Sequence, residues 1–348
     1  MKILAIDTSC DETAASVTEN ARVLSNIIWS QASQHADFGG VMPSLAQRLH
    51  KERIDWVVNK AIINSKLQII NLDAIAVTIG PGLAIALEVG ISKAKELALK
   101  YNKPLIPVNH IEAHLLSPLS NSKLSILNYK FPALGLVVSG GNTILVKINQ
   151  IGEYETLAQT VDDALGEALD KGARMLGLGY PGGAILEKFA RSSNSGQARY
   201  NLPIPLIDDK IKNRFSYSGL KTAFFRLIEK ARLPAGQEKP LTKEKIYNLA
   251  ASFQEVAFQH ILRVVSYQIT NHQSLITNHF LLGGGVANNN LLRSKLRKLL
   301  KPCGITLHVP YSKKLCGDNA AMIGVCAYLK YKKVKIIGTK LEDIDRKP

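Results

Sequence analysis

The chain has 348 residues, of which 44 are Lys or Arg and 28 are Asp or Glu, so its formal charge is +16 at pH 7. A chain of this length can form two domains, each with its own hydrophobic core. Because 46% of the residues are hydrophobic, the composition excludes a disordered chain, a collagen and a low-complexity scaffold. The large positive charge favours an anionic partner, and a polyanion such as RNA suits it better than one small metabolite.

Cysteine usage and hydropathy indicate the compartment. The cysteines are Cys10, Cys303, Cys316 and Cys326. They are too few and too widely spaced for a disulfide framework or a Cys-x-x-Cys zinc knuckle, so a reducing compartment is expected. The apolar N-terminus meets Asp7 too early for a signal peptide, and the longest uncharged apolar stretch, 74–87, is broken by Gly-Pro-Gly. We expect a cytoplasmic protein without a membrane span.

The first half begins with a strand, a turn and a second strand. Residues 2–7 read as a buried strand, 8–12 as a polar turn, and 13–18 as a strand that pairs back on the first. Further along this half the pattern predicts helices and one strand. The helices are expected over 44–65, 83–101 and 107–117, and the strand over 73–79.

The second half repeats this plan. Residues 132–148 again form an apolar strand, a turn of small hydroxyl and glycine residues, and a second strand. Helices are expected over 162–178, 183–192, 216–232, 243–272, about 288–300 and 317–330, with a strand over 279–285. The repeat predicts two similar α/β halves that begin near residues 1 and 131, with mixed sheets and a ligand cleft between two lobes.

Three glycine or hydroxyl turns are candidate phosphate cradles, because small residues let backbone N–H groups converge on an anion. They are Asp-Thr-Ser after the first strand, Ser-Gly-Gly-Asn-Thr at 139–143, and Gly283–Gly285 before an expected helix. Each turn alone is equally typical of an ordinary hairpin or loop. Together, and with a helix N-terminus after the last, they predict a nucleotide site.

A histidine pair predicts a metal site. His110 and His114 stand at i and i+4 in HIEAH, one turn apart on one helical face. Asp318 is the candidate third ligand, although its place before a helix is also typical of a capping carboxylate. Two histidines and one carboxylate suit iron or zinc better than magnesium. The alternative is that both histidines only cap or pack locally.

The HIEAH sequence does not fit a zinc protease. Such an enzyme needs Glu directly after the first His, whereas Glu112 stands two residues after His110, about 200° round the helix. That carboxylate therefore cannot act on water bound to the same metal.

Acidic and basic clusters remain open to two interpretations. Asp7, Asp11 and Glu12 lie in or beside the first turn; Asp162, Asp163, Glu167 and Asp170 lie at an expected helix start, where carboxylates usually cap or solubilise. Glu167 and Lys171 have the spacing of a helical ion pair.

Basic residues gather at Arg293, Lys295, Arg297, Lys298 and Lys301, and at Lys330, Lys332, Lys333 and Lys335. Each basic cluster suits either nucleic acid or a solvated helix face and tail.

Taken together, these segments resemble the bacterial TsaD family of tRNA threonylcarbamoyladenosine transferases over essentially the full length. The resemblance rests on the segments ILAIDTSCDET, SQASQHADFGGVMPSLAQRLH, TIGPGL, HIEAH, LVVSGGNT, DDALGEALDKGARMLGLGYPGG, FSYSGLKTA, GGGVANNNLLR and CGDNAAMI.

The resemblance implies an actin/Hsp70/sugar-kinase-like ATPase fold with two ribonuclease-H-like lobes around a central nucleotide and metal cleft. We expect the first lobe at 1–130, the second at 131–330 with a helical insertion at about 180–272, and a basic tail at 331–348. The implied reaction passes a threonylcarbamoyl group from threonylcarbamoyl-AMP to N6 of the tRNA adenosine beside the anticodon, and releases AMP.

The family pattern also implies roles for residues. His110, His114 and Asp318 would hold one divalent metal, Fe(II) or zinc. The remaining implied residues contact substrate: Val137, Val138, Ser139, Gly140 and Gly141 the phosphate and carbamate, Asp170 and Glu187 the ribose, Gly183 the nucleoside, and Asn289 the adenine. Asp11, Glu12 and Ser139 fall near the reacting centre.

The chain departs from the family pattern at three places, and the resemblance implies partners. Asn142 replaces a usual His, Met42-Pro43-Ser44 replaces Val-Pro-Glu, and Ala184 replaces a common Pro. None of these removes a metal ligand. The implied partners are tRNA, a TsaB-like paralogue and a TsaE-like ATPase, with the adenylate made by a TsaC-like synthase. The alternatives are a kinase-like ATPase of the same fold and a non-catalytic tRNA-binding scaffold.

Overall fold

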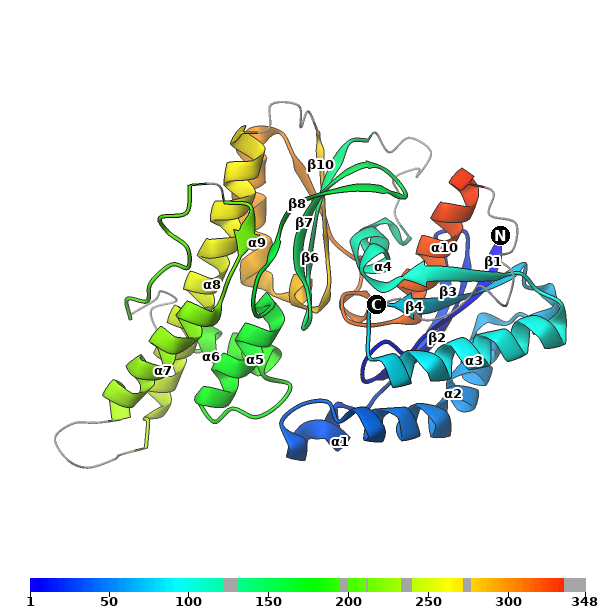
Figure 1. Ribbon diagram of the computed structural model, residues 1–348, viewed down its shortest axis with the longest axis horizontal. Helices are drawn as coiled ribbons and strands as arrows, with labels where there is room; N and C mark the ends of the chain where they lie inside the picture. The colour runs from blue at the N-terminus through cyan, green and yellow to red at the C-terminus, as the bar shows by residue number, and fades with distance from the viewer. Residues whose placement is uncertain (122–130, 194–199, 211, 233–239, 272–276, 335–348) are drawn as a thin grey trace.

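The computed structural model describes the chain except residues 122–130, 194–199, 211, 233–239, 272–276 and 335–348. Two α/β lobes lie side by side, each built on a mixed sheet (Figure 1). Among the helices of the described residues, none is both long and apolar enough to cross a membrane.

The first sheet has the order β3-β2-β1-β4-β5. Its strands are β1 (Lys2–Asp7), β2 (Glu12–Glu19), β3 (Arg22–Ser30), β4 (Ala74–Gly80) and β5 (Leu105–Asn109). Side chains alternate along β1, because successive residues of a strand point to opposite faces. Leu4 and Ile6 pack in the core with α2 (Pro43–Ser65) and α3 (Ala84–Tyr101), whereas Ile3 and Ala5 pack in the core with α10 (Ala320–Val334).

The second sheet repeats this strand order. Its strands are β6 (Ala133–Val138), β7 (Thr143–Gln150), β8 (Glu153–Thr160), β9 (Arg214–Phe215), β10 (His279–Gly283) and β11 (Thr306–His308). The order β8-β7-β6-β10-β11, with β9 added at the edge, matches the first sheet strand for strand and direction for direction. The internal repeat predicted from the sequence is therefore confirmed.

One face of the second sheet carries most of the remaining helices (Figure 1). They are α5 (Leu165–Met175), α6 (Gly182–Arg191), α7 (Ser218–Arg232), α8 (Lys243–Asn271) and α9 (Asn290–Leu300). Their apolar faces form one large core with Leu134, Leu136 and Val138 of β6. The aromatic pair Phe224 and Phe253, with ring centroids 4.5 Å apart, joins α7 to α8 within it.

Two helices lie where the lobes meet: α4 (His110–Leu116) and α10. Their apolar residues share a core with Val137 and Leu281 of the second sheet and with the first sheet. A Cβ at position 283 would overlap the backbone carbonyl of His114, so Gly283 allows α4 to lie directly on β10. We propose that the first lobe spans 1–130 and the second 131–330, with a helical insertion at about 180–272. The helix α10 returns from the end of the second lobe to pack on the first sheet.

Most predicted helices and strands are present, and the differences have physical reasons. The helix expected over 107–117 is wrong in its first part, because Leu105–Asn109 is β5 and the helix begins at His110. Strands β3 and β8 were missed, since both are half exposed and lack a clear apolar alternation. The helix expected from 162 begins at Leu165, because the Asp162 carboxylate accepts hydrogen bonds from Ser216, Tyr217 and Ser218 instead.

His260 on α8 is a buried histidine of the second lobe, with no exposed surface. One ring nitrogen accepts a hydrogen bond from the backbone N–H of Ser216 at 3.2 Å, and the ring lies edge-on to Phe215 and Tyr217. Burial, reinforced by the charge of Arg263, lowers the pKa of His260 to about 4. The native state therefore prefers the neutral imidazole.

The free energy of unfolding should fall as the pH drops from about 6.5, where the unfolded histidine titrates, to about 4. A neutral His260→Gln variant lacks this dependence. The stability difference between the two proteins should therefore shrink on acidification by up to about 3 kcal/mol. Urea denaturation at several pH values measures it, and a difference independent of pH would contradict the neutral buried state.

Candidate active site

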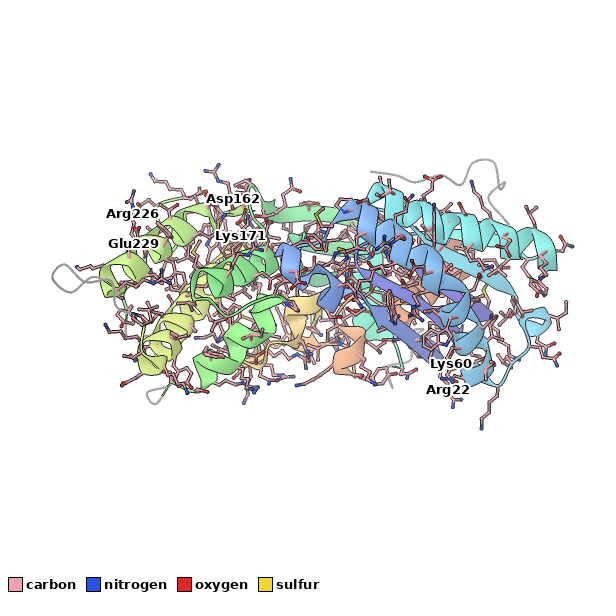
Figure 2. The ribbon with its side chains drawn as sticks, turned by 90° about the horizontal axis from the view of Figure 1, so that it is seen from below. Arg22, Lys60, Asp162, Lys171, Arg226 and Glu229 are labelled. Atoms are coloured by element: carbon pink, nitrogen blue, oxygen red, sulfur yellow. The ribbon has the colours of Figure 1, made fainter. Side chains whose placement is uncertain are left out.

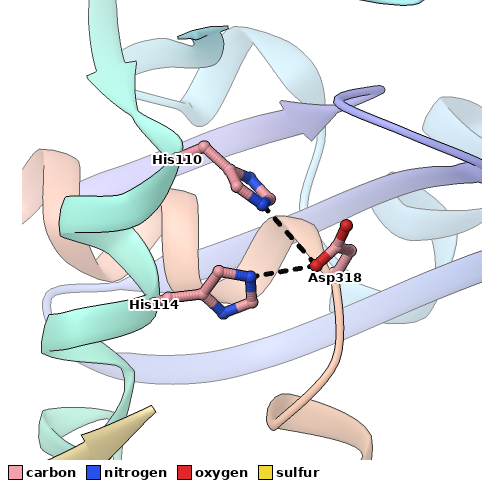
Figure 3. A group of neighbouring side chains, drawn as sticks. All are labelled: His110, His114 and Asp318. Carbon is pink, nitrogen blue, oxygen red and sulfur yellow. Dashed lines mark hydrogen bonds and ion pairs between the residues drawn. The ribbon is translucent and has the colours of Figure 1, made fainter. Parts of the chain in front are cut away.

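Two imidazoles from α4 and a carboxylate from the loop before α10 converge between the lobes (Figure 3). Nε2 of His114 lies 2.9 Å, and Nε2 of His110 3.6 Å, from Oδ1 of Asp318. One ligand atom from each of the three residues lies within 4.8 Å of the others. The three candidate metal ligands predicted from the sequence are thus brought together.

Helix caps explain this arrangement. The side chain of Asn109 accepts hydrogen bonds from the N–H groups of Ile111 and Glu112, so α4 begins at His110 and its histidines stand one turn apart. At the start of α10, Asn319 accepts from the N–H of Met322. Asp318 is therefore not the helix cap, and that alternative interpretation is wrong. Its carboxylate is directed at the histidines instead.

The residues fit a transition metal. Metal–ligand bonds of about 2.0–2.2 Å at tetrahedral or octahedral angles separate ligand atoms by about 2.8–3.6 Å, which includes the two histidine–Asp318 distances here. His110 Nδ1, His114 Nδ1 and Asp7 Oδ2 are buried without a hydrogen-bond partner among the described residues. Asp7 Oδ2 lies 3.8 Å from His110 Nδ1, the position of a carboxylate that orients a metal-bound imidazole.

Burial and charge act in opposite directions at these groups. Burial disfavours the charged imidazole, but Asp318 and Asp7 outweigh it and raise the pKa of His110 to about 9. Burial likewise opposes ionisation of Asp318, and the His110 charge outweighs it, so the pKa of this carboxyl lies well below its usual range. In the metal-free protein, the two groups form an ion pair that a metal must displace with release of a proton.

A cavity of about 730 Å³ opens beside the metal ligands. The residues that line it come from both halves of the repeat: Ser9, Cys10, Asp11, Glu12, Gly39, Gly40, Pro81, Gly82, Leu83, His110, Ser139, Gly140, Gly141, Asn142, Glu167, Asp170, Lys171, Arg174, Tyr180, Pro181, Gly285, Gly317 and Asp318. The turns predicted to cradle phosphate therefore face one another and the metal ligands across a single cleft.

The carboxylates that follow the first strand are largely shielded from solvent. Asp11 is only 9% exposed. Burial, followed by the negative charge of Asp318, raises the pKa of Glu12 well above its ordinary value. A carboxyl group in such a place is poised to hold or accept a proton near neutral pH.

The second turn offers backbone donors. The N–H of Ser139 donates to the carbonyl of Asn142, and the Ser139 hydroxyl accepts from the Asn142 N–H, which closes the turn. A Cβ placed on Gly140 or Gly141 would have no atom within 4 Å, so a ligand has room to approach the backbone there. The Val137 and Val138 side chains are buried in the core, so only their backbone can approach a ligand.

A second cavity of about 250 Å³ shares Gly140, Asp170, Pro181 and Gly285 with the first. Gly183, Ala184, Glu187, Asn288 and Asn289 also line it. Oδ1 of Asp170 accepts the Gly183 N–H at 2.6 Å, and Glu187 accepts the Asn290 N–H at 3.1 Å. These residues, predicted to bind a nucleoside, are therefore neighbours.

The side chain of Asn289 is already engaged. Its carbonyl oxygen caps α9 by accepting from the N–H groups of Leu291 and Leu292, and its amide donates to Gln254. By contrast, Oδ1 of Asn288 is buried without a hydrogen-bond partner among the described residues. Asn288, which the sequence did not single out, is thus the freer amide in this cavity.

Sequence reasoning also missed a bridge between the lobes. The guanidinium of Arg174 on α5 donates to the carbonyl of Gly39, whose neighbour Gly40 lines the larger cavity. Gly39 stands in the segment FGG and the cavity residue Tyr180 in LGYPGG, and both segments are part of the family resemblance. That resemblance could therefore have pointed to both residues. Of the departures from the family pattern, Asn142 lines the larger cavity and Ala184 the smaller one.

Charge is spread over both lobes. Figure 2 shows basic side chains at both ends of the molecule, with Arg22 and Lys60 on the first lobe and Lys171 and Arg226 on the second. Lys171 pairs with Glu167, as the helical spacing predicted, and with Asp163. In the basic cluster on α9, Lys295 pairs with Glu255 on α8 at 2.7 Å. The tail from 335 lies outside the described residues.

Solved structures similar to this chain establish the type of fold. The chain aligns over 95% of its length with HypF of T. kodakarensis, of which it covers 48%, at 15% identity and a TM-score of 0.60. It aligns over 96% of its length with all of component A of (R)-2-hydroxyglutaryl-CoA dehydratase from Acidaminococcus fermentans, at 13% identity and a TM-score of 0.54. The expected two-lobed actin/sugar-kinase-like fold is confirmed.

Sequence comparison establishes the family. The model of TsaD, described as tRNA N6-adenosine threonylcarbamoyltransferase, matches residues 22–325. The enzyme of that name from Trichlorobacter lovleyi is 43% identical over 94% of this chain and 92% of its own length. The one from Persephonella marina is 43% identical over 98% and 93%. The chain belongs to the TsaD family and transfers the threonylcarbamoyl group to the N6 position of a tRNA adenosine.

Proposed function

We propose that the two connected cavities bind threonylcarbamoyl-AMP, and that the tRNA adenosine beside the anticodon enters the larger one to accept the group. The observation that carries this proposal is the shared wall of the cavities. It brings the candidate nucleoside-binding residues within reach of both glycine turns and of the His110, His114 and Asp318 group. A bound adenylate would thus extend from the smaller cavity to the metal ligands.

At the nucleoside end, Asp170 and Glu187 would bind the ribose. One oxygen of Asp170 already accepts the Gly183 N–H, which fixes the carboxylate and leaves its second oxygen for a hydroxyl. Asn289 shapes the wall beside the adenine, and the buried amide oxygen of Asn288 can accept from the adenine amine.

At the reacting end, the turn 139–141 would hold the phosphate and the carbamate. Since the Ser139 N–H is used within the turn, the available backbone donors are those of Gly140 and Gly141. Val137 and Val138 would contribute only backbone. The Ser139 hydroxyl lies in the wall that also holds His110 and Asp318.

One divalent metal, Fe(II) or zinc, held by His110, His114 and Asp318 would supply Lewis-acid polarisation of a carbamoyl or phosphate oxygen. The adenosine amine attacks the carbamoyl carbon. The bond between that carbon and the phosphate oxygen then breaks, and AMP leaves. Asp11 or Glu12 accepts the proton that the amine loses. The raised pKa of Glu12 makes its carboxylate a stronger base than a carboxylate in water.

The family establishes tRNA as the substrate. The further partners remain our proposal: a TsaB-like paralogue, a TsaE-like ATPase and a TsaC-like synthase that makes the adenylate, all in the cytoplasm. This proposal is supported by the segment SQASQHADFGG at 30–40, which resembles the bacterial rather than the archaeal branch of the family.

The first prediction concerns transfer itself. Purified protein, with and without the two partner proteins, is given threonylcarbamoyl-AMP carrying labelled threonine and unmodified tRNA, and nucleosides are analysed by mass spectrometry. We expect N6-threonylcarbamoyladenosine, and its loss together with loss of bound metal in His110→Ala. An absence of product under every combination, despite bound metal and nucleotide, would favour a kinase-like ATPase.

The second prediction concerns the base. Glu12→Gln keeps the size of the side chain but cannot take a proton, so kcat should fall at least about hundredfold while adenylate binding is kept. Glu19→Gln, at the far end of β2, is the matched control. If Glu12→Gln kept full transfer activity, Asp11 would be the remaining candidate for the base.

The third prediction concerns the nucleoside cavity. Asp170→Asn keeps an oxygen for the Gly183 N–H but removes the charge from the ribose contact. Affinity for AMP, measured by calorimetry, should fall about tenfold or more. Asp163→Asn, which disturbs the pairing with Lys171 on the same helix, should leave AMP affinity unchanged. Equal losses in both variants would argue against the ribose role.

A further inference from the structure

Glu112 of the HIEAH segment is turned away from the metal ligands. Glu112 is two residues from each histidine. Its side chain therefore projects from the opposite side of α4, about 160–200° around the helix axis from both histidine side chains. The carboxylate is only 8% exposed, and both of its oxygens are engaged. Oε1 accepts the Tyr154 hydroxyl at 2.7 Å, and Oε2 accepts the Lys330 ammonium at 2.8 Å.

Lys330 and Asp318 hold α4 from two sides. Asp318 directly precedes Asn319 and α10, whereas Lys330 lies about 15 Å further along that helix at about 1.5 Å per residue. One end of α10 thus meets the histidine face of α4, and the other reaches the Glu112 face. The sequence had allowed Lys330 to be part of a solvated basic tail, but its ammonium points inward to a buried carboxylate.

Tyr154 adds the second lobe to this contact. It stands on β8, and its hydroxyl oxygen also accepts the Gly152 N–H at 3.0 Å. Burial and the neighbouring Glu112 raise the pKa of Tyr154, so the phenol keeps its proton. Burial disfavours the ammonium, but Glu112 outweighs it and raises the pKa of Lys330. Both oxygens of the Glu112 carboxylate therefore have a donor, one from β8 and one from α10.

We propose that Glu112, Tyr154 and Lys330 form a clamp whose role is to position the metal ligands by fixing α4 against α10 and β8. The clamp rests on the metal site of the proposed function. A buried ion pair adds little net stability, because the cost of removing its charges from water offsets their attraction. It does define one geometry, and here that geometry sets the distance between the His110 and His114 side chains and Asp318.

The test measures metal binding in the full-length, metal-free protein. Tyr154→Phe removes one hydrogen bond and Lys330→Met removes the cation with similar bulk. Binding of Co(II), followed by its ligand-field absorption, and of Zn(II), by competition with a chelator, should weaken about tenfold, with altered Co(II) bands. Lys330→Arg keeps the charge and should restore both readouts.

Lys295→Met is the matched control. It removes a comparable partly buried ion pair, with Glu255, which joins α9 to α8 in the second lobe. It should lower the melting temperature without changing Co(II) absorption or Zn(II) affinity. If Tyr154→Phe and Lys330→Met behaved like this control, the clamp would be structural only and the proposal wrong.

Folding failure and failure of the metal site give different results. Circular dichroism identifies a variant that does not fold, and should Lys330→Met fail in this way, the milder Tyr154→Phe decides. If the unmutated protein bound no Co(II), or bound it equally well as His114→Ala, the metal site itself would be refuted and the clamp with it. Normal binding by the unmutated protein and by Tyr154→Phe would refute the clamp alone.

Discussion

The contact between two imidazoles and the Asp318 carboxylate lies where the lobes meet, in an interior crowded with acid. Asp7, Asp11, Glu12 and Asp318 all lie in or beside this one cleft, and burial raises the pKa of Asp7 and of Glu12. Like charges so close together in a low dielectric cannot all ionise without a compensating cation. In the metal-free protein, protonated His110 provides that compensation. A divalent cation would do so more completely, and the cleft is therefore electrostatically suited to one.

The precision of this contact depends on a helix of only seven residues. An isolated helix this short is unstable in water, so α4 owes its position to its surroundings. Asn109 fixes its first turn, Gly283 allows it to lie on β10, and α10 approaches it from two sides. The contacts that fix α4, and with it the two histidines, therefore come from both lobes.

Duplication of one strand order explains why the site forms at the interface. Each half places a turn after its first strand, and the two turns face the same cavity. The halves then differ in what they add. The first supplies the histidines and the Asp11 and Glu12 carboxylates, while the second supplies the glycine turn and the smaller cavity with Asp170 and Gly183. Neither half alone forms the larger cavity, and Arg174 links the two halves by donating to the Gly39 carbonyl.

Local patterns in the sequence were sufficient for the features that depend on near neighbours. The buried strands β1 and β6, the long helices α2 and α8, and the i, i+4 spacing of His110 and His114 follow from apolar periodicity and helical geometry. The sequence also offered Asp318 as the candidate third ligand, and the family resemblance implied the same role. Tertiary structure decided the rest: Asp318 binds histidine rather than capping a helix, Lys330 turns inward, and the Asp11 turn is buried. The strands β3 and β8 and the engaged side chain of Asn289 were likewise settled only by packing. The physical reason is common to all of them, because burial and pairing depend on partners far away in the sequence, whereas propensity and periodicity depend only on adjacent residues.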